Sequence, residues 1–98
     1  MATGISQHLV HRRLRRSAES LRLLREELRV VEEQLGVLDD ESRDAEIRAM
    51  VAETPAAAMD HHEARRHADA MRRHRDHLAA TIAELEARQD QLLDALGR

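Results

Sequence analysis

The chain has 98 residues, no cysteine and no aromatic residue, and its 16 arginines against 19 acidic residues give a formal net charge of −3. Without cysteine it can form neither a disulfide bond nor a thiolate metal site, and without Phe, Tyr or Trp it lacks the largest side chains that fill a thick core. The slight negative charge excludes a general electrostatic attraction to nucleic acid or to anionic lipid, and we expect no nucleic-acid partner.

The first half of the chain carries a regular apolar seam. From Val10 onward, apolar residues recur at alternating spacings of three and four, which places them along one stripe of an α-helix, as in a coiled coil. The pattern predicts a helix over residues 6–53. Gly36 lies inside this helix and costs it roughly 1 kcal/mol relative to alanine. The first seam consists of Val10, Leu14, Ser17, Leu21, Leu24, Leu28, Val31, Leu35, Leu38, Ser42, Ala45, Ala49 and Ala52.

Pro55, the only proline of the chain, follows this first helix. Proline fits the first turn of a helix, and Thr54 before it is a good N-cap, so we predict a second helix over residues 55–96. The residue before a proline disfavours helical geometry, which ends the first helix at a turn near residues 53–55. A continuous rod kinked at Pro55 is the alternative, because a proline can bend a helix without ending it.

The second half repeats the seam in mirror order, which favours a hairpin over a rod. Seam residues whose numbers sum to 106 are similar in polarity or size, as facing residues would be in two antiparallel helices. We therefore predict an all-α fold, an antiparallel two-helix coiled-coil hairpin that forms one domain over residues 1–98. The second seam consists of Ala57, His61, Ala64, Ala68, Met71, Arg75, Leu78, Ile82, Leu85, Gln89, Leu92 and Leu96.

The distribution of charge supports the same register. Residues 8–25 contain six arginines against one acid, and residues 26–46 contain nine acids against two arginines, while the second helix shows the reverse order. We expect the basic segment His8–Arg16 to pair with Asp90 and Asp94, and Arg75 to reach Glu32. Exposed pairs of this kind contribute only about 0–1 kcal/mol each, so they select the register more than they stabilise it.

A second apolar stripe lies on the first helix, outside the seam, and one hairpin cannot cover it. We predict that it forms a partner interface, and that two hairpins pair through it into an antiparallel four-helix bundle, a homodimer. This predicted stripe consists of Leu9, Leu23, Val30, Val37 and Val51.

Five of the seven histidines fall within residues 61–77. His67, His74 and His77 are the candidate metal ligands, because helical spacing brings some of these residues within one turn. Arginines alternate with them and would repel a cation, so we assign no metal and no cofactor. A metal- or pH-responsive sensor that uses segment 61–77 stays as the alternative function.

The sequence offers no chemistry for an enzyme. It has no Cys, Lys or Tyr, no glycine-rich phosphate loop and no Ser-His-Asp arrangement. It also has no apolar run of 18 residues, so we expect no membrane span and a cytoplasmic location. We therefore predict a non-enzymatic interaction or regulatory module that binds a protein partner through the predicted stripe.

Overall fold

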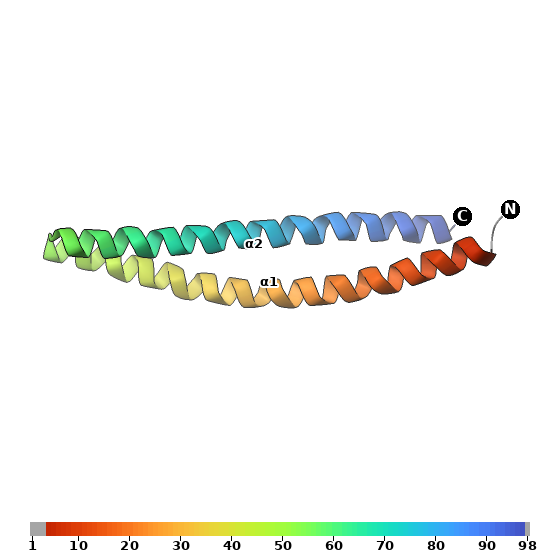
Figure 1. The fold of residues 1–98 in the computed structure, drawn as a ribbon, viewed down its shortest axis with the longest axis horizontal. Coiled ribbons are helices and arrows are strands. Elements are labelled where there is room, and N and C mark those ends of the chain that lie inside the picture. The colour runs from red at the N-terminus through yellow and green to blue at the C-terminus, as the bar shows by residue number, and fades with distance from the viewer. Residues whose placement is uncertain (1–3, 98) are drawn as a thin grey trace. The chain divides into compact units, whose positions relative to one another are not determined.

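The computed structural model describes residues 4–97 as two helices, α1 (Gly4–Ala52) and α2 (Pro55–Leu96) (Figure 1). The two helices pack against each other as a hairpin, which confirms the all-α prediction and shows that the kinked rod is wrong. Helix α1 begins two residues before the predicted start and ends one residue before the predicted end, while α2 has the predicted bounds. Residues 1–3 and 98 of the predicted domain lie outside the described residues.

Each of the residues Glu53, Thr54 and Pro55 helps to end α1 or to begin α2. Glu53 adopts a left-handed backbone with φ of 52°, and its N–H donates to the Ala49 carbonyl at 3.1 Å, which ends α1. The Thr54 hydroxyl accepts a hydrogen bond from the Ala57 N–H at 3.2 Å, which is the geometry of an N-cap. Pro55 then occupies the first helical position of α2, as the sequence predicts.

The chain divides into two compact units. The turn unit is Leu28–His77, which includes the turn, and the terminal unit comprises the described residues of Met1–Glu27 and Leu78–Arg98. In the turn unit the most buried side chains are Val31, Leu35, Ala45 and Ala68, and in the terminal unit they are Leu21, Leu78 and Ile82.

Burial follows the predicted seams closely in both helices. Every seam position is buried or half-buried except Ala52, which is exposed where α1 ends. Outside the seams, the only half-buried residues between positions 7 and 97 are Asp39, Asp69, Arg72 and Thr81. The core of each unit is therefore a single layer of side chains between two helices, as the lack of aromatic residues suggested.

Gly36 supplies a direct test of the helical geometry of α1. A Cβ atom at this position would meet nothing within 4 Å, and the backbone has no positive φ there. We expect Gly36→Ala to raise the free energy of unfolding by about 0.5–1 kcal/mol, because alanine has less conformational freedom to lose. Urea unfolding followed by circular dichroism measures this change, and a destabilised variant would contradict the placement of Gly36 on an open face.

Candidate protein-interaction surface

All five residues of the predicted stripe are exposed on α1. Val30, Val37 and Val51 belong to the turn unit, where Val37 is 57% exposed and Val51 is 81% exposed. Leu9 and Leu23 belong to the terminal unit. Exposed apolar side chains that recur on one helix face are typical of a surface that another molecule covers.

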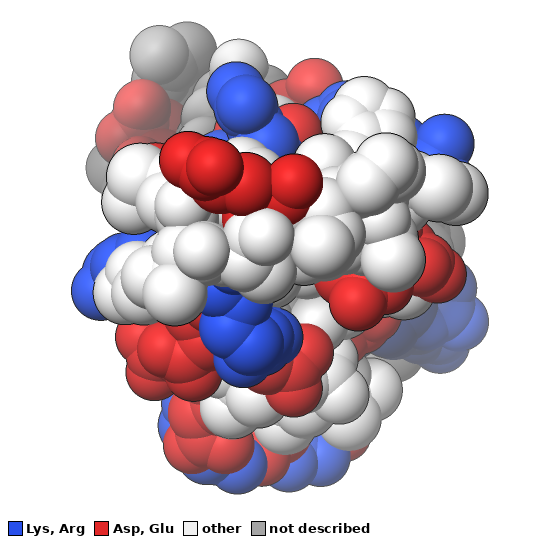
Figure 2. Space-filling model, turned by 90° about the vertical axis from the view of Figure 1, so that its left-hand side faces the viewer, with Lys and Arg blue, Asp and Glu red and all other residues white. Residues whose placement is uncertain are grey.

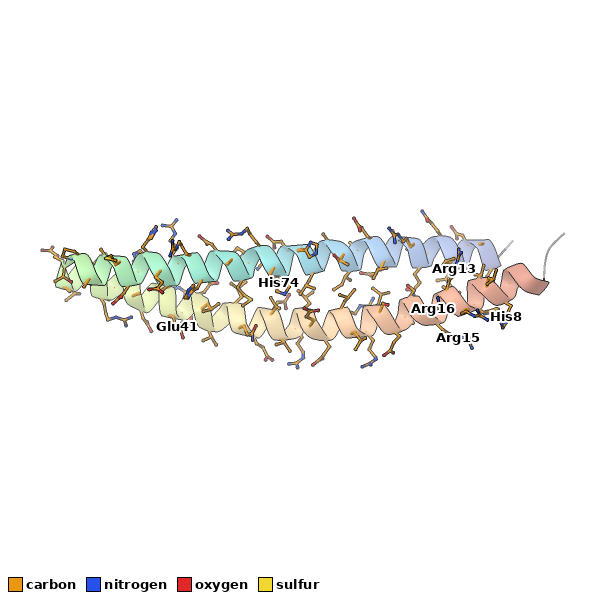
Figure 3. The ribbon with its side chains drawn as sticks, in the orientation of Figure 1. His8, Arg13, Arg15, Arg16, Glu41 and His74 are labelled. Atoms are coloured by element: carbon orange, nitrogen blue, oxygen red, sulfur yellow. The ribbon has the colours of Figure 1, made fainter. Side chains whose placement is uncertain are left out.

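In the turn unit, Val37 borders a shallow apolar groove between the two helices. Val37 and Gln34 line one end of the groove, of about 340 Å³, together with Leu38 and Met71. The groove continues over Leu38 and Met71 into a part of about 410 Å³, whose other lining residues are His67, Ala70 and His74. Figure 3 shows His74 on α2.

A second apolar cleft lies beside the turn. It has a volume of about 400 Å³, and its lining includes Ile47 and Val51 of α1 and Ala57 of α2. Arg48 and Asp60 also line it. Figure 2 views the molecule from the turn end and shows uncharged surface there, interrupted by separate acidic and basic groups.

The opposite side of the turn unit is polar and carries ion pairs around a pocket of about 280 Å³. The Arg72 guanidinium donates to Asp39 of α1 at 2.7 Å and to Asp69 of its own helix at 2.9 Å. His61 lies 3.8 Å from Glu46, between the imidazole Nε2 and the carboxylate Oε2. The two sides of the turn unit therefore differ in polarity: one carries ion pairs around a polar pocket, and the other carries an apolar groove.

The helical period explains this two-sidedness. Asp39 and Glu46 directly follow the seam residues Leu38 and Ala45, so they lie on one flank of the seam. Gln34 directly precedes the seam residue Leu35 and lies on the other flank, next to the row that contains Val30 and Val37. Asp39 and Glu46 occupy the first flank, whereas Gln34, Glu41 and Arg48 occupy the second, next to the apolar row.

In the terminal unit, the predicted pairing of the basic segment with Asp90 and Asp94 is wrong. Among residues 4–97, no ion pair joins either acid to an arginine of that segment. Asp94 lies midway between the seam residues Leu92 and Leu96, and Arg12 lies midway between Val10 and Leu14. Arg12 and Asp94 therefore point away from the facing helix, which keeps these two side chains apart. Figure 3 shows Arg13, Arg15 and Arg16 near the N-terminal end of α1.

The predicted contact between Arg75 and Glu32 is wrong, and other arginines form ion pairs within their own helix. The Arg75 guanidinium donates to the neighbouring Asp76 carboxylate at 2.9 Å, instead of reaching Glu32, because the adjacent acid requires no span between helices. Hydrogen bonds from Arg22, at 2.7 and 3.2 Å, lower the pKa of the exposed Glu19 carboxyl. In the terminal unit, an ion pair between the two helices joins Arg25 and Glu86 at 3.6 Å.

The histidines of segment 61–77 do not share one location. His67 and His74 line the apolar groove, whereas His61 lies on the ion-paired side beside Glu46. Within residues 4–97, no three His, Cys, Asp or Glu side chains lie close enough together to hold a metal ion. The structure therefore places two of the candidate ligands, His67 and His74, on the same surface as Val37.

Four large exposed apolar residues were not predicted as surface features: Ile47, Met50, Met59 and Leu93. Ile47 and Met59 lie equally far from Glu53, six residues on either side, and both lie midway between two seam positions. A comparison of residues outside the seams at equal distances from Glu53 would have identified Ile47 and Met59 from the sequence.

Within residues 4–97, no helix has an apolar stretch long enough to cross a bilayer. In the turn unit, the described residues offer an apolar groove beside the seam. Comparison of the chain with protein-family models, with curated proteins and with solved structures finds no match.

Proposed function

We propose that the chain is a non-enzymatic helical interaction module that binds a protein partner through the apolar side of the hairpin. The observation that carries this proposal is the contrast between the two sides of the turn unit. The side with Arg72 and Asp39 carries ion pairs around a polar pocket of about 280 Å³, while the side with Val37, Leu38 and Met71 is an apolar groove. A groove of this kind accepts an amphipathic helix by burying its apolar residues.

The partner that fits this surface most simply is a second hairpin. Two hairpins that pack through their apolar sides form a four-helix bundle, in which Val30 and Val37 leave water. Burial of apolar surface contributes roughly 25 cal/mol per Å², so even a modest contact along this stripe offsets part of the cost of association. We place the bundle in the cytoplasm, with the chain acting as an assembly or regulatory element.

A photo-reactive amino acid at position 37 tests this function. In the purified protein we expect light to produce an adduct of twice the chain mass from position 37. The matched control is position 43, whose arginine is exposed on α1 and borders neither the groove nor the cleft. If position 37 gives no protein adduct, either in purified protein or in a lysate of the native cell, the proposed function is wrong.

A second candidate, a metal- or pH-responsive sensor, is favoured by one observation: His67 and His74 line the apolar groove. Charging or metal binding at these side chains would change how the groove binds a partner. This candidate predicts a shift in melting temperature on adding Zn²⁺, or between roughly pH 5.5 and 7.5. The shift should disappear when His67, His74 and His77 are replaced by glutamine.

A further inference from the structure

The terminal unit contains a pocket that is lined by arginines from both helices. Arg13 of α1 and Arg88 of α2 line it together with Gln91 and Leu92, and its volume is about 300 Å³. Each arginine directly precedes a seam residue in the sequence, so each lies on a flank of its seam. Because both side chains line one pocket, these flanks lie on the same side of the unit. We call this site the arginine pocket.

Neither guanidinium of the arginine pocket is neutralised by an acid. Among residues 4–97, Arg13 and Arg88 form no ion pair. Glu84 lies four residues before Arg88 on the same helix, a spacing that permits an ion pair, but the described residues show none between them. Two positive charges that line one pocket repel each other, so an anion between them would offset this repulsion.

A third arginine extends the positive charge along α1. Arg16 is three residues from Arg13, which makes the two side chains neighbours on one face of the helix. Arg16 is exposed, and in the described part of the chain it has no ion-pair partner either. Figure 3 shows both arginines near the N-terminal end of α1. This face of the terminal unit is therefore cationic beside the pocket.

We propose that the arginine pocket binds a small soluble anion through a phosphate or diphosphate group, with Arg13 and Arg88 as its two cationic partners. A guanidinium presents N–H donors in a planar fork that matches phosphate oxygens, and the Gln91 amide adds further donors. A volume of about 300 Å³ is at the lower end for small-molecule sites, so the pocket holds the charged group of a ligand. This inference is independent of the apolar groove of the turn unit.

The number of cations favours a phosphate over a carboxylate. A single carboxylate carries one negative charge, which one arginine balances. A phosphate monoester carries about two negative charges near pH 7, which match the two guanidiniums of the pocket. A phosphate also offers more acceptor oxygens, so both arginines can donate to it at the same time.

The surrounding charges favour a small anion over an extended anionic surface. Residues 84–94 of α2 include four acids, which would repel an anionic bilayer or a nucleic-acid backbone laid along the unit. A small anion between Arg13 and Arg88 instead meets two cations at short range, where screening by salt is weakest. The chain also has no aromatic residue on which a nucleic-acid base could stack.

Titration with inorganic pyrophosphate, followed by isothermal titration calorimetry, tests the arginine pocket. At low ionic strength we expect saturable binding of one pyrophosphate per chain. The variant R13Q/R88Q should weaken this binding about tenfold or more, because it removes both charge-assisted contacts. The matched control R12Q/R15Q removes the same charge from exposed positions of α1 that do not line the pocket, and we expect a loss of less than about threefold. Circular dichroism should show unchanged helix content in both variants.

Three further probes distinguish the class of ligand. We expect acetate to bind about tenfold more weakly than pyrophosphate, because it carries one charge. We expect no binding to vesicles of phosphatidylserine and phosphatidylcholine, or to a single-stranded oligonucleotide. The absence of saturable pyrophosphate binding, or an equal loss in R13Q/R88Q and R12Q/R15Q, would overturn the site. Equal affinity for acetate would overturn the phosphate group, and binding to vesicles or oligonucleotide without pyrophosphate would overturn the small soluble ligand.

Discussion

Replacing Val30 and Val37 by glutamate should halve the mass of the protein in solution and leave its helices intact. Both side chains are exposed in the hairpin, so glutamate can reach water there without disturbing the seam. Glutamate also has a higher helix propensity than valine, so we expect no loss of helical signal. In a dimer, the same carboxylates would be buried without partners, which costs several kcal/mol and prevents association.

Light scattering coupled to size exclusion measures the mass of this variant, and circular dichroism measures its helix content. The matched control is Met50→Glu, at an exposed apolar position of α1 that lines none of the described grooves or clefts. We expect the control to keep the mass of the wild type. A double variant that unfolds would show that Val30 and Val37 belong to the core of the hairpin, and an unchanged dimer would place the interface elsewhere.

Leu21→Ala should lower the free energy of unfolding by about 2–5 kcal/mol, the largest loss of stability that we expect from one substitution. Leu21 is 1% exposed and is the most completely buried large side chain that the structure describes. Its truncation removes apolar contacts and leaves a cavity in a core that is only one layer thick. A small helical protein has little stability to lose, so the variant could be largely unfolded at 37 °C.

The comparison for Leu21 is Leu93→Ala, the same change at an exposed position of the same unit. Surface substitutions usually change stability by less than about 0.5 kcal/mol, so we expect this control to unfold at nearly the wild-type urea concentration. Similar midpoints for the two variants would mean that the side chains of the first seam do not form the core. Urea titration followed at 222 nm, the usual helix wavelength, separates the two outcomes.

The fold could be predicted from the sequence because one signal dominates it. Spacings of three and four continue through both helices, and the residues on them, from Leu14 to Leu92, are the ones that the structure buries. The turn was equally predictable, since Thr54 and Pro55 cap and start a helix by local geometry alone. Ala52 is the exception among seam residues because the chain turns away directly after it.

The contacts of charged side chains were harder to predict. The opposite net charges of the two segments suggested that the basic residues near Arg12 contact Asp94. Whether two such side chains can meet depends on the position of each residue around its helix axis. We expected Arg75 to contact Glu32 of the other helix, but it contacts Asp76 instead. Exposed ion pairs differ little in free energy, so the sequence does not indicate which nearby acid an arginine contacts. The exposed Met59 and Ile47 were missed because neither belongs to a seam or to the predicted stripe.

The most direct test of the interaction module is the mass of the wild-type chain in solution, measured by light scattering at two concentrations with and without Zn²⁺. We predict twice the chain mass of 11.2 kDa at the higher concentration, independent of metal. A mass of 11.2 kDa at both concentrations would contradict the four-helix bundle and leave the groove beside Val37 without its proposed occupant.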